Sequence, residues 1–115
     1  MKKTLIALAL IVATQIKSQV FVDNVNINEV GGNYCDIVGY ESGLIKKKTT
    51  VFVDYGQKTS ISTIAVITGA DKKTVVFNTI IDALNFMDKN GWSYVSNYAV
   101  STNEGIVYHY LLKKK

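Results

Sequence analysis

The sequence predicts an α+β domain: a twisted antiparallel sheet with one helix packed on a face, preceded by a signal peptide. Most of the 115 residues form short runs rich in β-branched and aromatic residues, separated by turns containing Gly, Asn, Asp or Lys. Such runs are typical of consecutive strands. One later segment has helical periodicity, and the first 18 residues have the layout of an export signal.

Residues 1–18 predict export. Two lysines precede the apolar run Leu5–Ala13, and a mainly polar stretch follows it around the small residue Ser18. This layout predicts cleavage between Ser18 and Gln19, which leaves residues 19–115 as a single domain. The apolar run is shorter than the roughly 20 residues of a membrane-spanning helix, although an uncleaved N-terminal anchor is the alternative. We therefore expect an exported bacterial-type protein, periplasmic or secreted, with no membrane span after cleavage.

The charge of the chain argues against nucleic acid as a partner. The formal net charge is +4, and all 13 basic residues are lysines. Three of these lysines leave with the signal, which contains no acidic residue, so the mature domain carries a formal charge of +1. A nearly neutral domain without arginine lacks both the positive field and the bidentate guanidinium groups that nucleic acid recognition uses.

Five strands are expected before the helix. Glycine-containing turns separate them, and the chain has no proline that would exclude strand pairing. The expected strands are Val20–Ile27, Tyr34–Tyr40, Thr49–Tyr55, Ile61–Thr68 and Thr74–Phe77.

The segment Thr79–Asn90 predicts the helix, because its apolar residues recur at helical spacing on one face. Asn78 or Thr79 can cap its start, and Asp82 stands at capping-box spacing. Gly91 can adopt the left-handed conformation that ends a helix, which would let Trp92 fold back toward the helix.

A C-terminal hairpin is expected after the helix. Its strands are Trp92–Val100 and Ile106–Leu112, joined by the turn Ser101–Gly105. Strict alternation predicts two faces. Trp92, Tyr94, Tyr98 and Val100 would share one face with Ile106, Tyr108, Tyr110 and Leu112, while Val95, Val107, His109 and Leu111 would lie on the other.

The helix and the hairpin carry a resemblance to other proteins. Ile81–Met87, Asn90–Trp92, Tyr94–Val95 and Val107–Lys114 resemble small uncharacterised exported bacterial proteins in which a helix ends in Gly-Trp and a hairpin follows. The chain is also similar to a short domain family of unknown function, from which it departs at the first signature glycine and at Ser93. The resemblance covers about the last third of the chain and implies a helix packed on an antiparallel sheet, without an activity.

No set of residues demands a particular chemistry. The chain has one His and one Cys, which does not predict a transition-metal site, and the polar cluster Asp23–Glu29 lacks the glycine and ligand order of an EF-hand loop. No cofactor is expected, because Gly69–Thr74 lacks the frame of a phosphate loop. Cys35 and His109 are the one nucleophile and base available, which leaves a small hydrolase as an alternative. A buried structural role is favoured for the Cys35 thiol.

The sequence therefore favours a non-enzymatic exported interaction module that uses an aromatic sheet face or a strand edge. Its partner would be a protein, a peptide or a glycan. Core packing is the competing interpretation of these rings, and both a homodimer and an inhibitor presenting Ser101–Gly105 remain open. The candidate binding residues are Trp92, Tyr94, Tyr98, Tyr108 and Tyr110.

Overall fold

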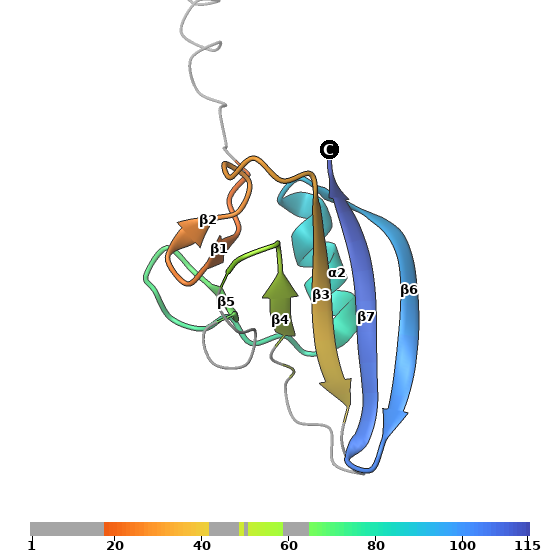
Figure 1. Ribbon diagram of the computed structural model, residues 1–115. Helices are drawn as coiled ribbons and strands as arrows, with labels where there is room; N and C mark the ends of the chain where they lie inside the picture. Colours follow the sequence, from red (N-terminus) through yellow and green to blue (C-terminus); the bar gives the residue numbers. More distant parts are fainter. Residues whose placement is uncertain (1–17, 42–48, 50, 59–64) are drawn as a thin grey trace, which may run out of the picture.

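The computed structural model describes residues 18–41, 49, 51–58 and 65–115, which form two antiparallel sheets and one helix (Figure 1). The predicted α+β class is confirmed. A three-stranded sheet has the order β2-β1-β5, and a four-stranded sheet has the order β4-β3-β7-β6. The elements are β1 (Phe21–Val22), β2 (Val25–Asn26), β3 (Tyr34–Glu41), β4 (Val51–Asp54), β5 (Ile67–Thr68), α2 (Ile80–Lys89), β6 (Trp92–Thr102) and β7 (Gly105–Lys114).

Residues 1–17 of the predicted signal peptide lie outside the described residues. Across the residues that are described, no helix is long and apolar enough to cross a membrane.

The prediction of one strand over Val20–Ile27 is wrong, because the chain reverses in its middle. β1 and β2 pair antiparallel around Asp23 and Asn24, whose φ angles are 50° and 62°. Asp and Asn tolerate this left-handed conformation better than other side chains, and two such residues in succession form a tight hairpin turn. The segment is therefore a short β-hairpin with a two-residue turn.

The prediction of a strand over Thr74–Phe77 is also wrong. Thr74 forms an isolated bridge with Thr68, whereas Phe77 forms one with Thr49. The segment thus changes partner within four residues, so it builds no ladder with either neighbour. Residues 61–64 of the expected strand Ile61–Thr68 lie outside the described residues, and in its described part the strand is β5.

The helix α2 forms as its sequence predicts. Thr79 caps it, since its Oγ1 accepts a hydrogen bond from the Asp82 backbone N–H at 3.2 Å. Asp82 in turn accepts from the Asn78 backbone N–H at 3.0 Å. Gly91 has a φ of 91°, the left-handed conformation expected after the last turn.

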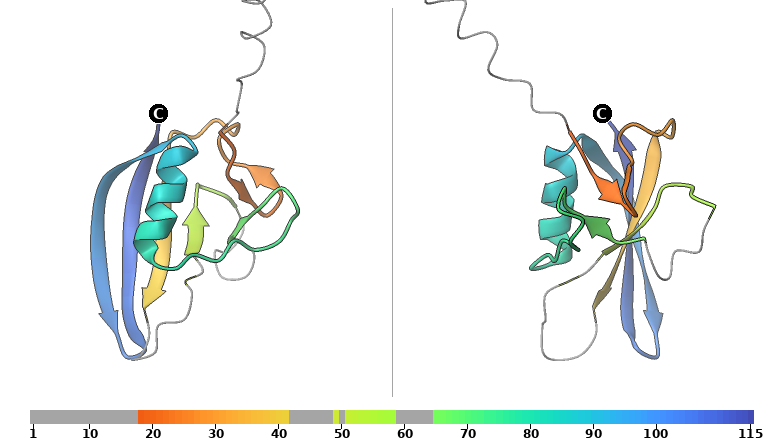
Figure 2. Two further views of the ribbon diagram at one scale, coloured as in Figure 1. Left: turned by 180° about the vertical axis from the view of Figure 1, so that it is seen from behind. Right: turned by 90° about the vertical axis from the view of Figure 1, so that its left-hand side faces the viewer.

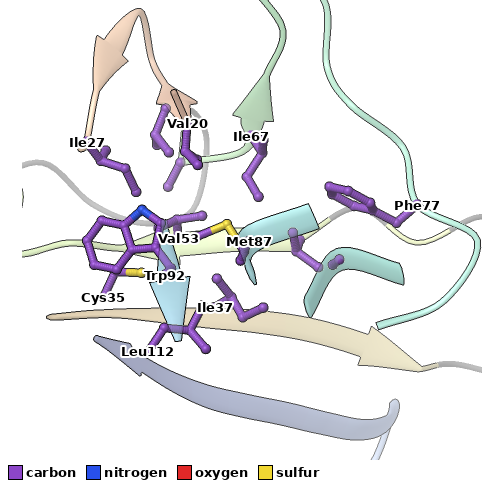
Figure 3. Close-up of a cluster of buried hydrophobic side chains, with 14 residues drawn as sticks. Val20, Ile27, Cys35, Ile37, Val53, Ile67, Phe77, Met87, Trp92 and Leu112 are labelled. Carbon is purple, nitrogen blue, oxygen red and sulfur yellow. The ribbon is translucent and has the colours of Figure 1, made fainter. Parts of the chain in front are cut away.

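The core lies between the four-stranded sheet on one side and α2 with the small sheet on the other (Figures 2 and 3). Trp92 is only 1% exposed and packs in the same cluster as Met87 of the helix. The remaining members of the cluster come from all parts of the described chain. They are Val20, Val22, Ile27, Cys35, Ile37, Val51, Val53, Ala65, Ile67, Phe77, Ala83 and Leu112.

Gly39 sets how closely the helix approaches the sheet. A Cβ atom at this position would lie 2.6 Å from Cδ1 of Ile80, the first residue of α2. Glycine therefore allows the first turn of the helix to pack against the middle of β3.

Asn28 joins the N-terminal hairpin to the end of the helix. Its Oδ1 accepts from the Val20 backbone N–H at 2.9 Å, and its Nδ2 donates to the Asn90 carbonyl oxygen at 2.7 Å. The partners lie 8 and 62 residues away along the chain. Asn28 belongs to the polar cluster Asp23–Glu29, and its amide has a structural role there.

The variant Asn28→Ala is expected to lose about 1–3 kcal/mol in the free energy of unfolding, because both backbone partners lose their hydrogen bonds. Urea unfolding followed by circular dichroism measures this loss. Asn85→Ala is the matched control, since Asn85 is exposed on α2 and alanine favours a helix. A loss no larger than that of the control would contradict the tie described for Asn28.

Candidate functional site

The C-terminal hairpin contains a β-bulge that decides which rings share a face. From Ser96 to Thr102, β6 pairs with β7 residue for residue. The register shifts between Tyr94 and Ser96, so Val95 is an extra residue on β6. One extra residue reverses the alternation of all side chains beyond it. The prediction that Trp92, Tyr94, Tyr98 and Val100 share a face is therefore wrong.

Four of the five candidate rings lie on the helix side of the sheet. Trp92 is in the core, and Tyr110 packs against the core with its ring centroid 6.3 Å from that of Tyr94. Tyr108 pairs with Gly39, the residue beneath the helix. The Tyr94 hydroxyl donates to Oδ1 of Asn97, and this hydrogen bond spans the bulge on the same face. The structure brings these four rings to one side and Tyr98 to the other.

The face turned away from α2 is here called the outer face (Figure 2). Strand register arranges it in rows that cross the sheet. The central row is Phe52, Val38, His109 and Tyr98; beside it lie Tyr40, Val107 and Val100 on one side and Asp54, Asp36, Leu111 and Ser96 on the other.

The outer face combines a packed centre with exposed rings. Val38 is only 7% exposed, with Phe52 and His109 as its neighbours in the row. Tyr40 and Tyr98 are 55% and 58% exposed. The Tyr40 ring meets the Phe52 ring edge to face, with centroids 5.6 Å apart. Large apolar groups thus remain open to solvent around a buried centre.

His109 connects the exposed Tyr98 ring to the carboxylate of Asp36. The two rings stack with centroids 4.4 Å apart and planes 6° from parallel. Nδ1 of the imidazole lies 2.9 Å from Oδ2 of Asp36. The sequence alone did not predict this cluster, because Asp36 and His109 are 73 residues apart and only the pairing of β3 with β7 joins them.

Asp36 and Asp54 stand directly opposite each other on β3 and β4. Like charges in such a cross-strand pair repel and destabilise the sheet. Oδ1 of Asp54 accepts from the Gly56 backbone N–H at 3.0 Å, and the Asp36 carboxylate contacts His109. The outer face therefore carries a facing pair of carboxylates, and the next row along β3 and β7 holds Tyr34 and Lys113.

Cys35 lies on the core side of β3, whereas His109 lies on the outer face. The thiol is 2% exposed, and its strand neighbour Asp36 is the residue that reaches His109. Burial, with smaller contributions from the charges of Asp36 and Asp54, raises the pKa of Cys35 to about 12. The structure does not bring the thiol and the imidazole together, and the thiol stays protonated near neutral pH.

The chemistry of the described residues is otherwise limited. Within the part of the chain that the structure describes, no group of three or more His, Cys, Asp or Glu side chains could hold a metal ion. No family model, curated protein or solved structure matches the chain. The resemblance of its last third to uncharacterised exported proteins stays a prediction.

Because the Cys35 thiol is buried, its contribution to the free energy of unfolding is expected to fall at alkaline pH. The folded state keeps the Cys35 proton up to a pKa of about 12, whereas the unfolded chain releases it from about 9. This contribution to stability is complete below pH 9 and is lost as the pH rises toward 12. The difference in unfolding free energy between the protein and Cys35→Ala should shrink across that range, measured by urea unfolding at pH 8 and pH 10.5. A constant difference would contradict the raised pKa.

Proposed function

We propose that this chain is a non-enzymatic exported interaction module whose outer face binds a polypeptide segment carrying a lysine or arginine. The observation that carries the proposal is the combination of exposed rings with the facing carboxylates of Asp36 and Asp54 on one sheet face.

The exposed rings supply contact area. Tyr40 and Tyr98 are more than half exposed, and Val100 is 44% exposed. Tyrosine rings bury a large area on binding and lose little conformational entropy, so they are common at the centres of protein interfaces. Because Tyr98 is stacked on His109, its ring is already oriented before a partner arrives.

The carboxylates supply the charge preference. Asp36 and Asp54 face each other, and the His109 imidazole lies near Asp36. Lys113 lies in the next row of the same face, where its Nζ is placed over the Tyr34 ring, 5.7 Å from the centroid. A cationic side chain from a partner would relieve their repulsion and could also lie over a neighbouring aromatic ring. A partner segment with acidic residues would meet repulsion at the same place.

A hydrolytic role has less support. The alternative mechanism requires a thiolate within hydrogen-bond reach of an imidazole. Cys35 and His109 lie on opposite faces, and the thiol has a raised pKa. The binding function needs neither group to react.

The position at which the buried core begins in the sequence supports the proposal that the protein is exported. Val20 is 0% exposed, and Asn28 accepts a hydrogen bond from its backbone N–H. Cleavage between Ser18 and Gln19 would leave this residue and all later described core residues in place. Cleavage at this point would therefore remove no described residue of the buried core.

We expect the protein recovered from the cell envelope or the medium of a bacterial expression host to begin at Gln19. The apolar run Leu5–Ala13 directs export, and Ser18 supplies the small residue before the cut. Intact-mass spectrometry measures the N-terminus. A Leu8→Lys variant, which interrupts the apolar run, is the control and should stay uncleaved. Full-length protein in the envelope would contradict cleavage.

Peptide binding is expected to perturb the outer face. The probes are two synthetic peptides of alternating tyrosine and serine that differ only in a central lysine or glutamate. In ¹H–¹⁵N correlation spectra, the lysine peptide should shift the amides of Asp36, Asp54 and His109, and the glutamate peptide should not. The double variant Asp36→Asn, Asp54→Asn should weaken binding about tenfold, the equivalent of about 1.4 kcal/mol.

Two tyrosines of similar exposure provide the matched control. Tyr98→Ala on the outer face should weaken lysine-peptide binding, whereas Tyr94→Ala, on the helix side and 55% exposed, should leave it unchanged. Equal effects of the two variants, or shifts confined to the helix side, would overturn the proposal. Binding of a chitin hexasaccharide in place of both peptides would replace it with a glycan-binding function.

A further inference from the structure

The edge strand β6 lacks most of the features that keep sheet edges from pairing. It is the last strand in the order β4-β3-β7-β6, and within the described residues its one strand neighbour is β7 (Figure 1). All residues from 94 to 102 are exposed. Natural edge strands are protected by lysine, proline, bulges or shortness. β6 has 11 residues, no charge and no proline, and its one bulge lies near its start.

The segment beyond the bulge is a regular run of seven residues. Ser96 to Thr102 pairs with β7 without interruption. Antiparallel pairing directs every second residue's backbone groups toward the open side of an edge strand. These groups can pair with another strand of similar length.

We infer that two copies of this chain pair through β6, antiparallel and across a two-fold axis at Ala99. In this register Ala99 faces Ala99 of the other copy, and the sheet continues from one copy into the next. This dimer goes beyond the proposed function, since it forms through the backbone edge of β6, although Tyr98 and Val100 of the outer face pair across the axis.

The sequence of β6 is complementary to itself in this register. Tyr98 would face Val100 of the second copy, and an aromatic ring beside a β-branched side chain is a favourable cross-strand pair. The small Ala99 side chains meet at the axis without a clash. The outer pairs would be polar on polar, with Ser96 facing Thr102 and Asn97 facing Ser101.

The absence of charge on β6 also favours a second copy of the chain as the partner of this strand edge. Since β6 carries no charged side chain, two copies meet without like-charge repulsion, and a charged partner strand would find no opposite charge on it. The axis also brings the two outer faces into one surface, because Tyr98 ends the row Phe52, Val38, His109, Tyr98. In the dimer this row continues into Val100 of the second copy.

The dimer should be weak. Seven paired residues span roughly 24 Å, so the contact covers much less than the ~800 Å² per partner of a standard stable interface. We expect an association that depends on protein concentration.

Disulfide trapping tests the register. Residues that face each other in antiparallel strands have Cα atoms about 4.5–5.5 Å apart, within the range that a disulfide bridges. Under mild oxidation, Ala99→Cys should form covalent dimers at least ten times faster than Ser101→Cys. In the proposed register two Ser101 positions are offset by four residues, about 13 Å along the strand. The native Cys35 is buried and should not react in either variant.

Sedimentation equilibrium tests the dimer without a cross-link. The weight-average mass of the unmodified protein should rise with concentration, and Ala99→Lys should stay monomeric because two lysines would meet at the axis. Ile106→Lys is the control. Ile106 is 40% exposed and lies on the helix side of the sheet, as Ala99 does, but it belongs to β7 and not to the edge strand. A monomeric protein at every concentration, or equal trapping rates for Ala99→Cys and Ser101→Cys, would overturn the inference.

Discussion

The pairing of β3 with β7 is the constraint on which the rest of the structure depends. Eight consecutive residue pairs, from Tyr34 with Lys113 to Glu41 with Ile106, fix the register of two segments that lie about 70 residues apart in sequence. Because side chains alternate between faces, this register sends Cys35 and Ile37 into the core and Asp36 and Val38 to the outer face. A slip by one residue would exchange the two sets and bury a carboxylate, so the core itself enforces the register.

The bulge at Val95 is the second determinant, because it lets one strand serve two surfaces. Before it, Trp92 and Tyr94 point toward the helix, where a large ring fills the core and a second ring packs beside Tyr110. Beyond it, Tyr98 points outward and stacks on His109. Without the extra residue, Tyr98 would follow Trp92 to the helix side, and the outer face would lose the ring that ends its central row.

Local signals in the sequence were sufficient for some elements and not for others. The helix could be predicted because the Thr79 cap, the apolar spacing and Gly91 are all local. The reversal at Asp23 and Asn24 also has a local signal, two residues that tolerate positive φ, but the apolar residues on both sides suggested one continuous strand. The bulge, the bridges of Thr74–Phe77 and the contact of His109 with Asp36 depend on residues distant in sequence, so alternation within one strand could not reveal them. The candidate rings were identified correctly as rings of the hairpin, but their division between two faces required the structure.

The two faces of the large sheet differ in how far they are covered. On the helix side, Ile37, Met87 and Trp92 are at most 1% exposed, so the part of that face beneath α2 and the small sheet is occupied by the protein's own core, whereas Tyr94 on the same side is 55% exposed. On the outer face, burial is confined to the middle of one row, where Val38 lies between Phe52 and His109. The Tyr40 and Tyr98 rings stay open, and the carboxylates of Asp36 and Asp54 lie in a neighbouring row. The exposed Tyr40 and Tyr98 rings are of the residue type that is enriched at the energetically important positions of protein interfaces. The same parity that builds the core therefore leaves exposed rings and carboxylates on the outer face, the surface that we propose binds a partner.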